Sequence, residues 1–218
     1  VTRPPFFMEI LFVGCSITWG DELQDRLKDR YSRLVCDALG ANETNIAECG
    51  QSNDWIARKT VEAVRAKQYD RVYVQLTIPC RMEYFVKDGS FNFTPQAALM
   101  PHKPYKNEMR AYYKYIKNDS HDIENMYKNK FIIESAVKSD LIFLGADCCM
   151  PNLPPQMYMH DRSAWNQFCD VNPIWIWRDI LGHAFKQGPN GKKESHPLED
   201  SHKKIADYLL NSTKYTKI

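Results

Sequence analysis

The stretch EILFVGCSITWG, residues 9–20, decides the fold. Its first half, residues 9–13, is a short apolar run that ends at Gly14. The brevity and β-rich content of this run predict a strand buried on both faces of a sheet. Ser16 then lies beyond the carboxyl end of that strand, which is where open parallel sheets bind their ligands. Position alone leaves two interpretations open: Ser16 is a nucleophile, or it merely caps the following turn.

Segments typical of strands and of helices alternate along the rest of the chain. Strands separated by helices imply a parallel sheet with right-handed crossovers. We therefore expect an α/β fold that forms one domain over residues 1–218, with an irregular and helical insertion at about 81–118. Further strands are expected at 44–47, 71–76 and 141–144, and helices at 27–39, 53–64, 109–116, 122–137, 173–185 and from 198 onward.

The composition excludes several classes of protein. A formal charge of +2 lacks the basic excess of a nucleic-acid-binding protein, so no nucleic-acid partner is expected. No apolar run reaches the roughly 20 residues that span a bilayer, so no membrane partner is expected either. Seven cysteines, an odd number without a C-x-x-C pair, indicate mostly reduced thiols, so a soluble, cytoplasmic or virion-associated protein is expected.

A second polar motif lies near the other end of the chain. Glu194-Ser195-His196-Pro197 precedes the last helix, and an imidazole is the usual base that activates a serine hydroxyl. His202 falls on the apolar stripe of that helix, with Ile205 and Leu209, and is interpreted as a structural residue. The remaining histidines show no metal-ligand spacing, so no metal site is expected.

These motifs resemble the SGNH (GDSL-like) hydrolases. The first block of that family, Gly-Asp-Ser-(Leu/Ile)-Thr, is similar to GCSITWGDEL at 14–23, with a cysteine in place of the aspartate. NIAECGQSND at 45–54 and SHPLEDSHKKIADYL at 195–209 resemble later blocks, particularly those of SGNH-like proteins from phages and other microbial viruses. The resemblance implies a three-layer α/β/α sandwich with a mostly parallel sheet of four to five strands and flavodoxin-like topology.

The resemblance also implies the site. Ser16 matches the nucleophile, His196 the general base, and Gly50 the glycine whose backbone N–H joins that of Ser16 in the oxyanion hole. Family members commonly carry an aspartate three residues before the histidine. Lys193 occupies that position here, so Glu194 is our candidate for the orienting acid.

One family residue is missing. After the third strand the family has Gly-x-Asn-Asp, whereas this chain has Thr77-Ile78-Pro79-Cys80-Arg81. Pro79 has no N–H to donate, and the loss of one oxyanion donor costs about 100- to 1000-fold in turnover. Arg81, Thr77 or the amide of Asn53 is expected to substitute, Asn53 in the oxyanion hole and the other two toward the substrate.

The resemblance implies a serine hydrolase of carboxylic esters that needs no cofactor. Its expected partner is a small-molecule or glycan ester, such as a short-chain or acetyl ester of a carbohydrate. The alternative is an SGNH-fold module of a virion, or one that binds carbohydrate, with weakened catalysis. The aromatic residues of 80–104 either line a pocket or form a satellite core, and the second interpretation is slightly favoured.

Overall fold

The computed structural model describes residues 7–146, 174–181 and 196–212. Its main sheet has five strands in the order β2-β1-β3-β6-β7, and every neighbouring pair is parallel. This is the flavodoxin-like order, so the predicted fold class is confirmed. The strands are β1 (Glu9–Val13), β2 (Asn42–Asn45), β3 (Arg71–Leu76), β6 (Asp140–Gly145) and β7 (Ile174–Trp175).

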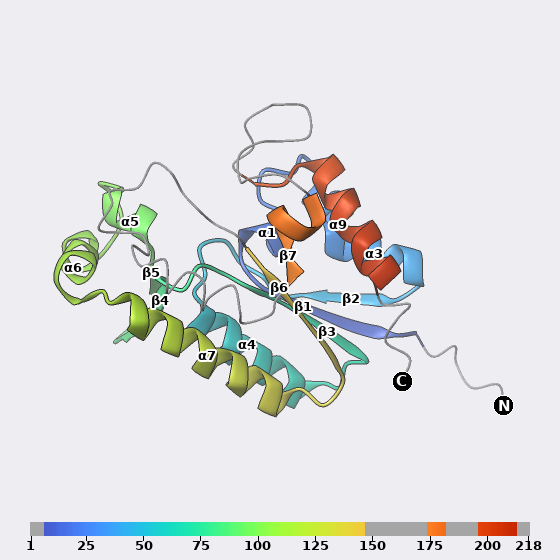
Figure 1. Cartoon of the computed structure of the whole chain (residues 1–218), viewed down its shortest axis with the longest axis horizontal. Coiled ribbons are helices and arrows are strands. Elements are labelled where there is room, and N and C mark those ends of the chain that lie inside the picture. Colours follow the sequence, from blue (N-terminus) through green and yellow to red (C-terminus); the bar gives the residue numbers. More distant parts are fainter. Residues whose placement is uncertain (1–6, 147–173, 182–195, 213–218) are drawn as a thin grey trace.

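Helices cover both faces of the sheet, as Figure 1 shows, with α3 and α9 on one side and α4 and α7 on the other. Successive side chains of β1 enter opposite cores: Phe12 packs with Tyr31 and Tyr73, whereas Leu11 packs with Ile56. Residues 10–13 of β1 are fully buried, as expected. The helices of these layers are α1 (Ser16–Trp19), α2 (Arg26–Asp29), α3 (Tyr31–Leu39), α4 (Asn53–Ala66), α7 (Asp119–Ala136) and α9 (Glu199–Ser212).

The single helix predicted over 27–39 is wrong, because the chain breaks at Arg30. The backbone of Arg30 is extended, with φ −67° and ψ 141°, and it separates α2 from α3. The Arg30 guanidinium binds both carboxylate oxygens of Glu43 on β2, each at 3.0 Å. This bidentate pair fixes the break, and it leaves Leu27 59% exposed instead of buried.

Two other boundaries differ from the prediction. The edge strand β2 covers residues 42–45 instead of 44–47. Residues 42–45 are polar and lack the apolar pattern of a strand, but they pair with β1 from Glu9 onward. The helix predicted over 173–185 begins as strand β7 beside β6, and a π-helical segment, η3 (Ile176–Leu181), follows it. The rest of that predicted helix lies outside the described residues.

Residues 80–104 belong to the insertion expected to be irregular and helical. They contain two strands and a short helix. Strands β4 (Met82–Val86) and β5 (Gly89–Phe93) form an antiparallel hairpin. The Tyr84 ring lies 4.3 Å from that of Phe93, which lies 5.7 Å from that of Tyr112, so these aromatic residues form a satellite core. The elements that follow the hairpin are α5 (Pro95–Leu99), α6 (Lys106–Ala111) and the π-helical η1 (Tyr112–Ile116).

His202 connects α9 to α3 inside the core, and the structure places it fully buried. Its Nδ1 accepts the backbone N–H of Tyr31 at 3.0 Å. Burial, together with the nearby His196, lowers the pKa of His202 from 6.5 to about 3. His202 is therefore neutral in the folded protein at neutral and mildly acidic pH.

We expect acid to destabilise the fold through His202. Below pH 6.5 the unfolded chain binds a proton that the folded chain binds only near pH 3, so stability falls as the pH falls through that window. Between pH 8 and pH 5 this single group removes about 2 kcal/mol from the free energy of unfolding. Urea unfolding at the two pH values measures the change. In His202→Gln the pH dependence should be smaller by this amount, and an unchanged dependence would contradict the assignment.

Candidate active site

The turn that carries Ser16 is held by a buried side chain from the neighbouring strand. Gln75 Oε1 accepts the backbone N–H groups of Cys15 at 3.2 Å and Thr18 at 3.1 Å, and the Thr18 hydroxyl at 2.8 Å. A Cβ atom at Gly14 would lie 2.8 Å from Gln75 Cβ and 2.6 Å from Thr18 Oγ1, so only glycine fits there. Ser16 is thereby fixed as the first residue of α1 at the carboxyl end of β1.

His196 lies against the same turn, although it is 180 residues away in the sequence. Its Nε2 is 3.7 Å from Asp21 Oδ2, and its Nδ1 is 3.4 Å from Glu22 Oε1. The backbone N–H of Asp21 donates to the carbonyl oxygen of Ser16 at 3.0 Å. Both residues are described, and no hydrogen bond joins the Ser16 hydroxyl to the His196 ring; such bonds are often long in unliganded sites.

Several hydrogen-bond donors converge beside Ser16, on the thiol of Cys15. Arg81 Nη1 lies 2.8 Å from Cys15 Sγ, and Ser16 Oγ lies 3.6 Å from it. Burial alone would raise the pKa of the Cys15 thiol. The Arg81 charge, the Ser16 hydroxyl and the backbone N–H groups of Ser16 and Gly50 outweigh burial and lower that pKa. The environment next to Ser16 thus stabilises negative charge.

Arg81 connects the loops that follow the first three strands. Besides Cys15, its Nη1 reaches Thr77 Oγ1 at 3.0 Å and the carbonyl oxygen of Gln51 at 3.3 Å. The guanidinium is buried, with 7% of the residue exposed. Arg81 therefore lies between the loop of Ser16 and that of Gly50.

Asn53 and Thr77 are bound to each other. Asn53 Nδ2 donates to the Thr77 carbonyl oxygen at 3.0 Å, and Asn53 Oδ1 accepts the Thr77 N–H at 2.8 Å. The second N–H of the Asn53 side-chain amide takes no part in these two hydrogen bonds. Thr77 is 2% exposed, and its hydroxyl lies 3.0 Å from Arg81 Nη1.

Three residues of the site escaped the sequence analysis, and the expected acid is not among the described residues. Glu194 lies outside the described ranges, whereas Asp21 and Glu22 face His196. A signal for both existed, since two carboxylates directly follow the Ser16 block in SITWGDEL. The sequence also offered a signal for Gln75, because it is the one amide side chain in the predicted buried strand RVYVQL.

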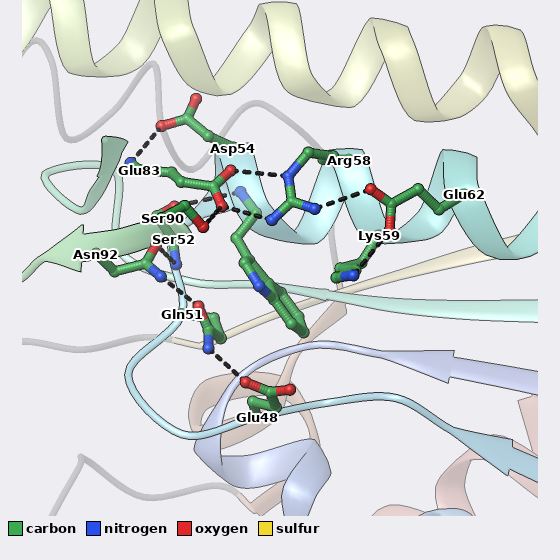
Figure 2. Close-up of polar contacts among 11 residues, drawn as sticks. Glu48, Gln51, Ser52, Asp54, Arg58, Lys59, Glu62, Glu83, Ser90 and Asn92 are labelled. Atoms are coloured by element: carbon green, nitrogen blue, oxygen red, sulfur yellow. Dashed lines mark hydrogen bonds and ion pairs between the residues drawn. The ribbon is translucent and has the colours of Figure 1, made fainter. Parts of the chain in front are cut away.

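The β4–β5 hairpin holds the loop that contains Gly50. Figure 2 shows Asn92 of β5 beside this loop: Asn92 Oδ1 accepts the Ser52 N–H at 2.9 Å, and Asn92 Nδ2 donates to Gln51 Oε1. Gln51 Nε2 donates in turn to Glu48 at 2.8 Å. Gly50, with φ +78°, adopts the left-handed conformation that glycine tolerates best.

An ion pair anchors the same hairpin to α4 (Figure 2). The Arg58 guanidinium binds the Glu83 carboxylate with Nη2 at 2.6 Å and Nε at 3.2 Å. The Glu83 side chain is only 2% exposed, so this charge depends on its partner. Ser90 Oγ adds a hydrogen bond to Glu83 at 2.7 Å, and the Glu83 N–H donates to Asp54 at 3.1 Å.

The flavodoxin-like sheet places a serine just after its first strand and a histidine shortly before helix α9. No protein-family model and no curated protein sequence matches this chain. Solved structures do, at low sequence identity. A member of the lipolytic G-D-S-L family from Veillonella parvula is 12% identical, with a TM-score of 0.52, 95% of this chain covered and 99% of that one.

Two esterases give similar alignments. An acetylxylan esterase from Geobacillus stearothermophilus, determined as a catalytic mutant, is 15% identical, with a TM-score of 0.53 and coverage of 95% of this chain and 94% of that one. A psychrotrophic esterase from Pseudoalteromonas sp. is 15% identical, with a TM-score of 0.51 and coverage of 94% and 96%. The chain therefore has the fold of these proteins. Within the ranges that the structure describes, no helix has the length and apolar character needed to cross a bilayer.

We expect Asn92→Ala to loosen the Gly50 loop. The substitution leaves the buried Ser52 N–H without its acceptor, which costs about 1 kcal/mol or more of local stability. Hydrogen exchange followed by mass spectrometry should show roughly fivefold faster exchange in peptides covering 48–53. Asp88→Ala, at the exposed turn between β4 and β5, is the matched control and should leave that loop unchanged. Equal exchange in both variants would show that the hairpin does not hold the loop.

Proposed function

We propose that this chain is a serine hydrolase of carboxylic esters, with Ser16 as nucleophile and His196 as general base. The observation that carries the proposal is the meeting of two distant segments: His196 lies against the turn whose first residue is Ser16. The esterase structures with the same fold support the reaction class. The chemistry requires no cofactor.

In this mechanism His196 accepts the Ser16 hydroxyl proton while Oγ attacks the ester carbonyl carbon. The tetrahedral intermediate collapses when the bond to the alkoxy group breaks, and His196 returns its proton to the leaving alcohol. Water then repeats the sequence on the acyl-enzyme: His196 takes a proton from water, hydroxide attacks the acyl carbon, and Ser16 leaves with the proton. The products are an alcohol and a carboxylic acid.

The oxyanion of the intermediate is held by the backbone N–H groups of Ser16 and Gly50, with Arg81 in place of the missing asparagine. The lowered pKa of the Cys15 thiol supports this assignment, because the same donors stabilise negative charge on Cys15 Sγ. Thr77 fixes the guanidinium, and Asn53 ties the loop of Gly50 to the end of β3. Guanidinium donors are strong here because the site is buried and the charge is permanent.

For the substrate we propose short-chain or acetyl esters of carbohydrates, since one of the similar structures is an acetylxylan esterase. The competing function is an SGNH-fold module of a virion or a carbohydrate-binding module. The missing asparagine and the open Ser16–His196 contact favour that alternative. The expected relation to phage and viral proteins belongs with it.

We expect the wild-type protein to hydrolyse a short-chain nitrophenyl ester and Ser16→Ala to lose at least about 10³-fold in kcat. The reason is that no other hydroxyl occupies the start of α1. Ser120→Ala, an exposed serine at the start of α7, is the matched control and should keep full activity. Equal rates in wild type and Ser16→Ala would end the esterase proposal. Glycan binding unaffected by Ser16→Ala, without turnover, would favour the binding module.

We expect Arg81→Gln to lower kcat about 100- to 1000-fold, the cost of one oxyanion donor. Its KM should change little, because the oxyanion forms only in the transition state. Arg65→Gln, at an exposed position of α4, is the control for the loss of a positive charge. Thermal unfolding should accompany the kinetics, so that a folding defect is distinguished from a catalytic one. An unchanged kcat in folded Arg81→Gln would assign Arg81 to the structure alone.

A further inference from the structure

We propose that Glu22 is the carboxylate that orients His196, replacing the acid that the family places before the histidine. The inference rests on the proposed function and deepens it by naming the positioning residue of the same site. It differs from the sequence expectation, which favoured Glu194, a residue outside the described ranges.

The first argument is the environment of His196 Nδ1. This nitrogen is buried and has no hydrogen-bond partner among the described residues. A buried polar nitrogen of this kind needs an acceptor, and water does not reach it. Glu22 Oε1 lies 3.4 Å away. A small reorientation of either side chain, which moves these atoms by a few tenths of an ångström, completes a hydrogen bond between them.

The second argument is that two neighbouring carboxylates face different nitrogens of the His196 ring. An orienting acid must face Nδ1, because Nε2 has to remain toward the nucleophile. Glu22 faces Nδ1, whereas Asp21 Oδ2 lies 3.7 Å from Nε2. Asp21 therefore lies on the nucleophile side of the ring, and Glu22 is the one placed for the orienting role.

The third argument is the backbone of Glu22. Its φ is 67°, in the left-handed region that glycine and asparagine adopt more easily than glutamate. From this conformation the side chain reaches to 3.4 Å from His196 Nδ1. The surrounding turn holds it: the Asp21 N–H binds the Ser16 carbonyl oxygen, and the Gln24 N–H binds Glu199 Oε1 at 3.3 Å.

A consequence is that nucleophile and acid belong to one short turn. Glu22 lies six positions after Ser16, and the base reaches this turn from the segment that precedes α9. Among the described residues, the charged and titratable groups that face His196 are Asp21 and Glu22 from the turn and the buried His202 from α9. Glu22 supplies a negative charge on the Nδ1 side that stabilises the imidazolium formed during the reaction.

The test is steady-state kinetics of Glu22→Gln across a pH series. Removal of the carboxylate should lower kcat by at least about 10-fold and by less than the roughly 10⁴-fold loss of a buried triad acid, since Glu22 is half exposed. KM should stay nearly constant. The acidic limb of the pH–rate profile should move to lower pH, because the imidazolium loses a neighbouring negative charge. Glu22→Asp, which retains the charge, should recover part of the rate.

Two further variants make the result decisive. Asp25→Asn removes a carboxylate from the same segment, where it pairs with Lys28, and should leave kcat and the pH profile unchanged. Glu194→Gln tests the rival acid. A larger loss in Glu194→Gln than in Glu22→Gln, or an unmoved acidic limb in Glu22→Gln, would overturn the proposal.

Failure of this inference is distinguishable from failure of the proposed function. If wild type and Ser16→Ala are equally inactive, the esterase proposal fails and Glu22 has no base to orient. If Ser16→Ala is inactive while Glu22→Gln keeps the wild-type rate and profile, the esterase proposal stands and the inference about Glu22 is wrong. Thermal unfolding of each variant excludes a change in folding as the cause.

Discussion

The site depends on one buried oxygen, Oε1 of Gln75. It accepts three donors from the turn that follows β1, two of them backbone N–H groups of Cys15 and Thr18. A buried N–H without an acceptor is costly, so the turn has a single well-satisfied conformation. Gly14 permits the close approach of this side chain, and the position of Ser16 follows from it.

Around this turn the structure arranges loops that come from separate strands. Arg81 joins the first and second of them from the end of β3, and the β4–β5 hairpin clamps the second from outside. The insertion therefore also holds the loop of Gly50 in place. It is attached by the ion pair between Arg58 and Glu83, so the geometry near Gly50 depends on residues far from the nucleophile.

The parallel sheet and the two ends of the site could be predicted from the sequence, because they follow from apolar periodicity and from short motifs next to strands. EILFV and RVYVQL are legible as strands, and the position of Ser16 after the first of them needs no long-range information. The hairpin over 82–93 was missed because its strands are short, exposed on one side and aromatic on the other. Such segments lack the continuous apolar run of a buried strand.

The acid facing His196 was missed for a different reason. Sequence reasoning placed it by its distance along the chain from the histidine, whereas Glu22 reaches the ring only through the fold. The break at Arg30 is similar, since the ion pair with Glu43 overrides a helical pattern that continues through it. Local patterns predict elements, and long-range charge pairs then decide where those elements begin and end.

Two histidines with opposite requirements lie in and just before helix α9. His196, the proposed base, precedes the helix, while His202 lies inside the core and must remain uncharged to hold Tyr31. Adaptation of this scaffold to acidic surroundings would therefore need replacements at both positions at once. A variant with a base suited to low pH would still lose its last helix when the buried imidazole takes up a proton.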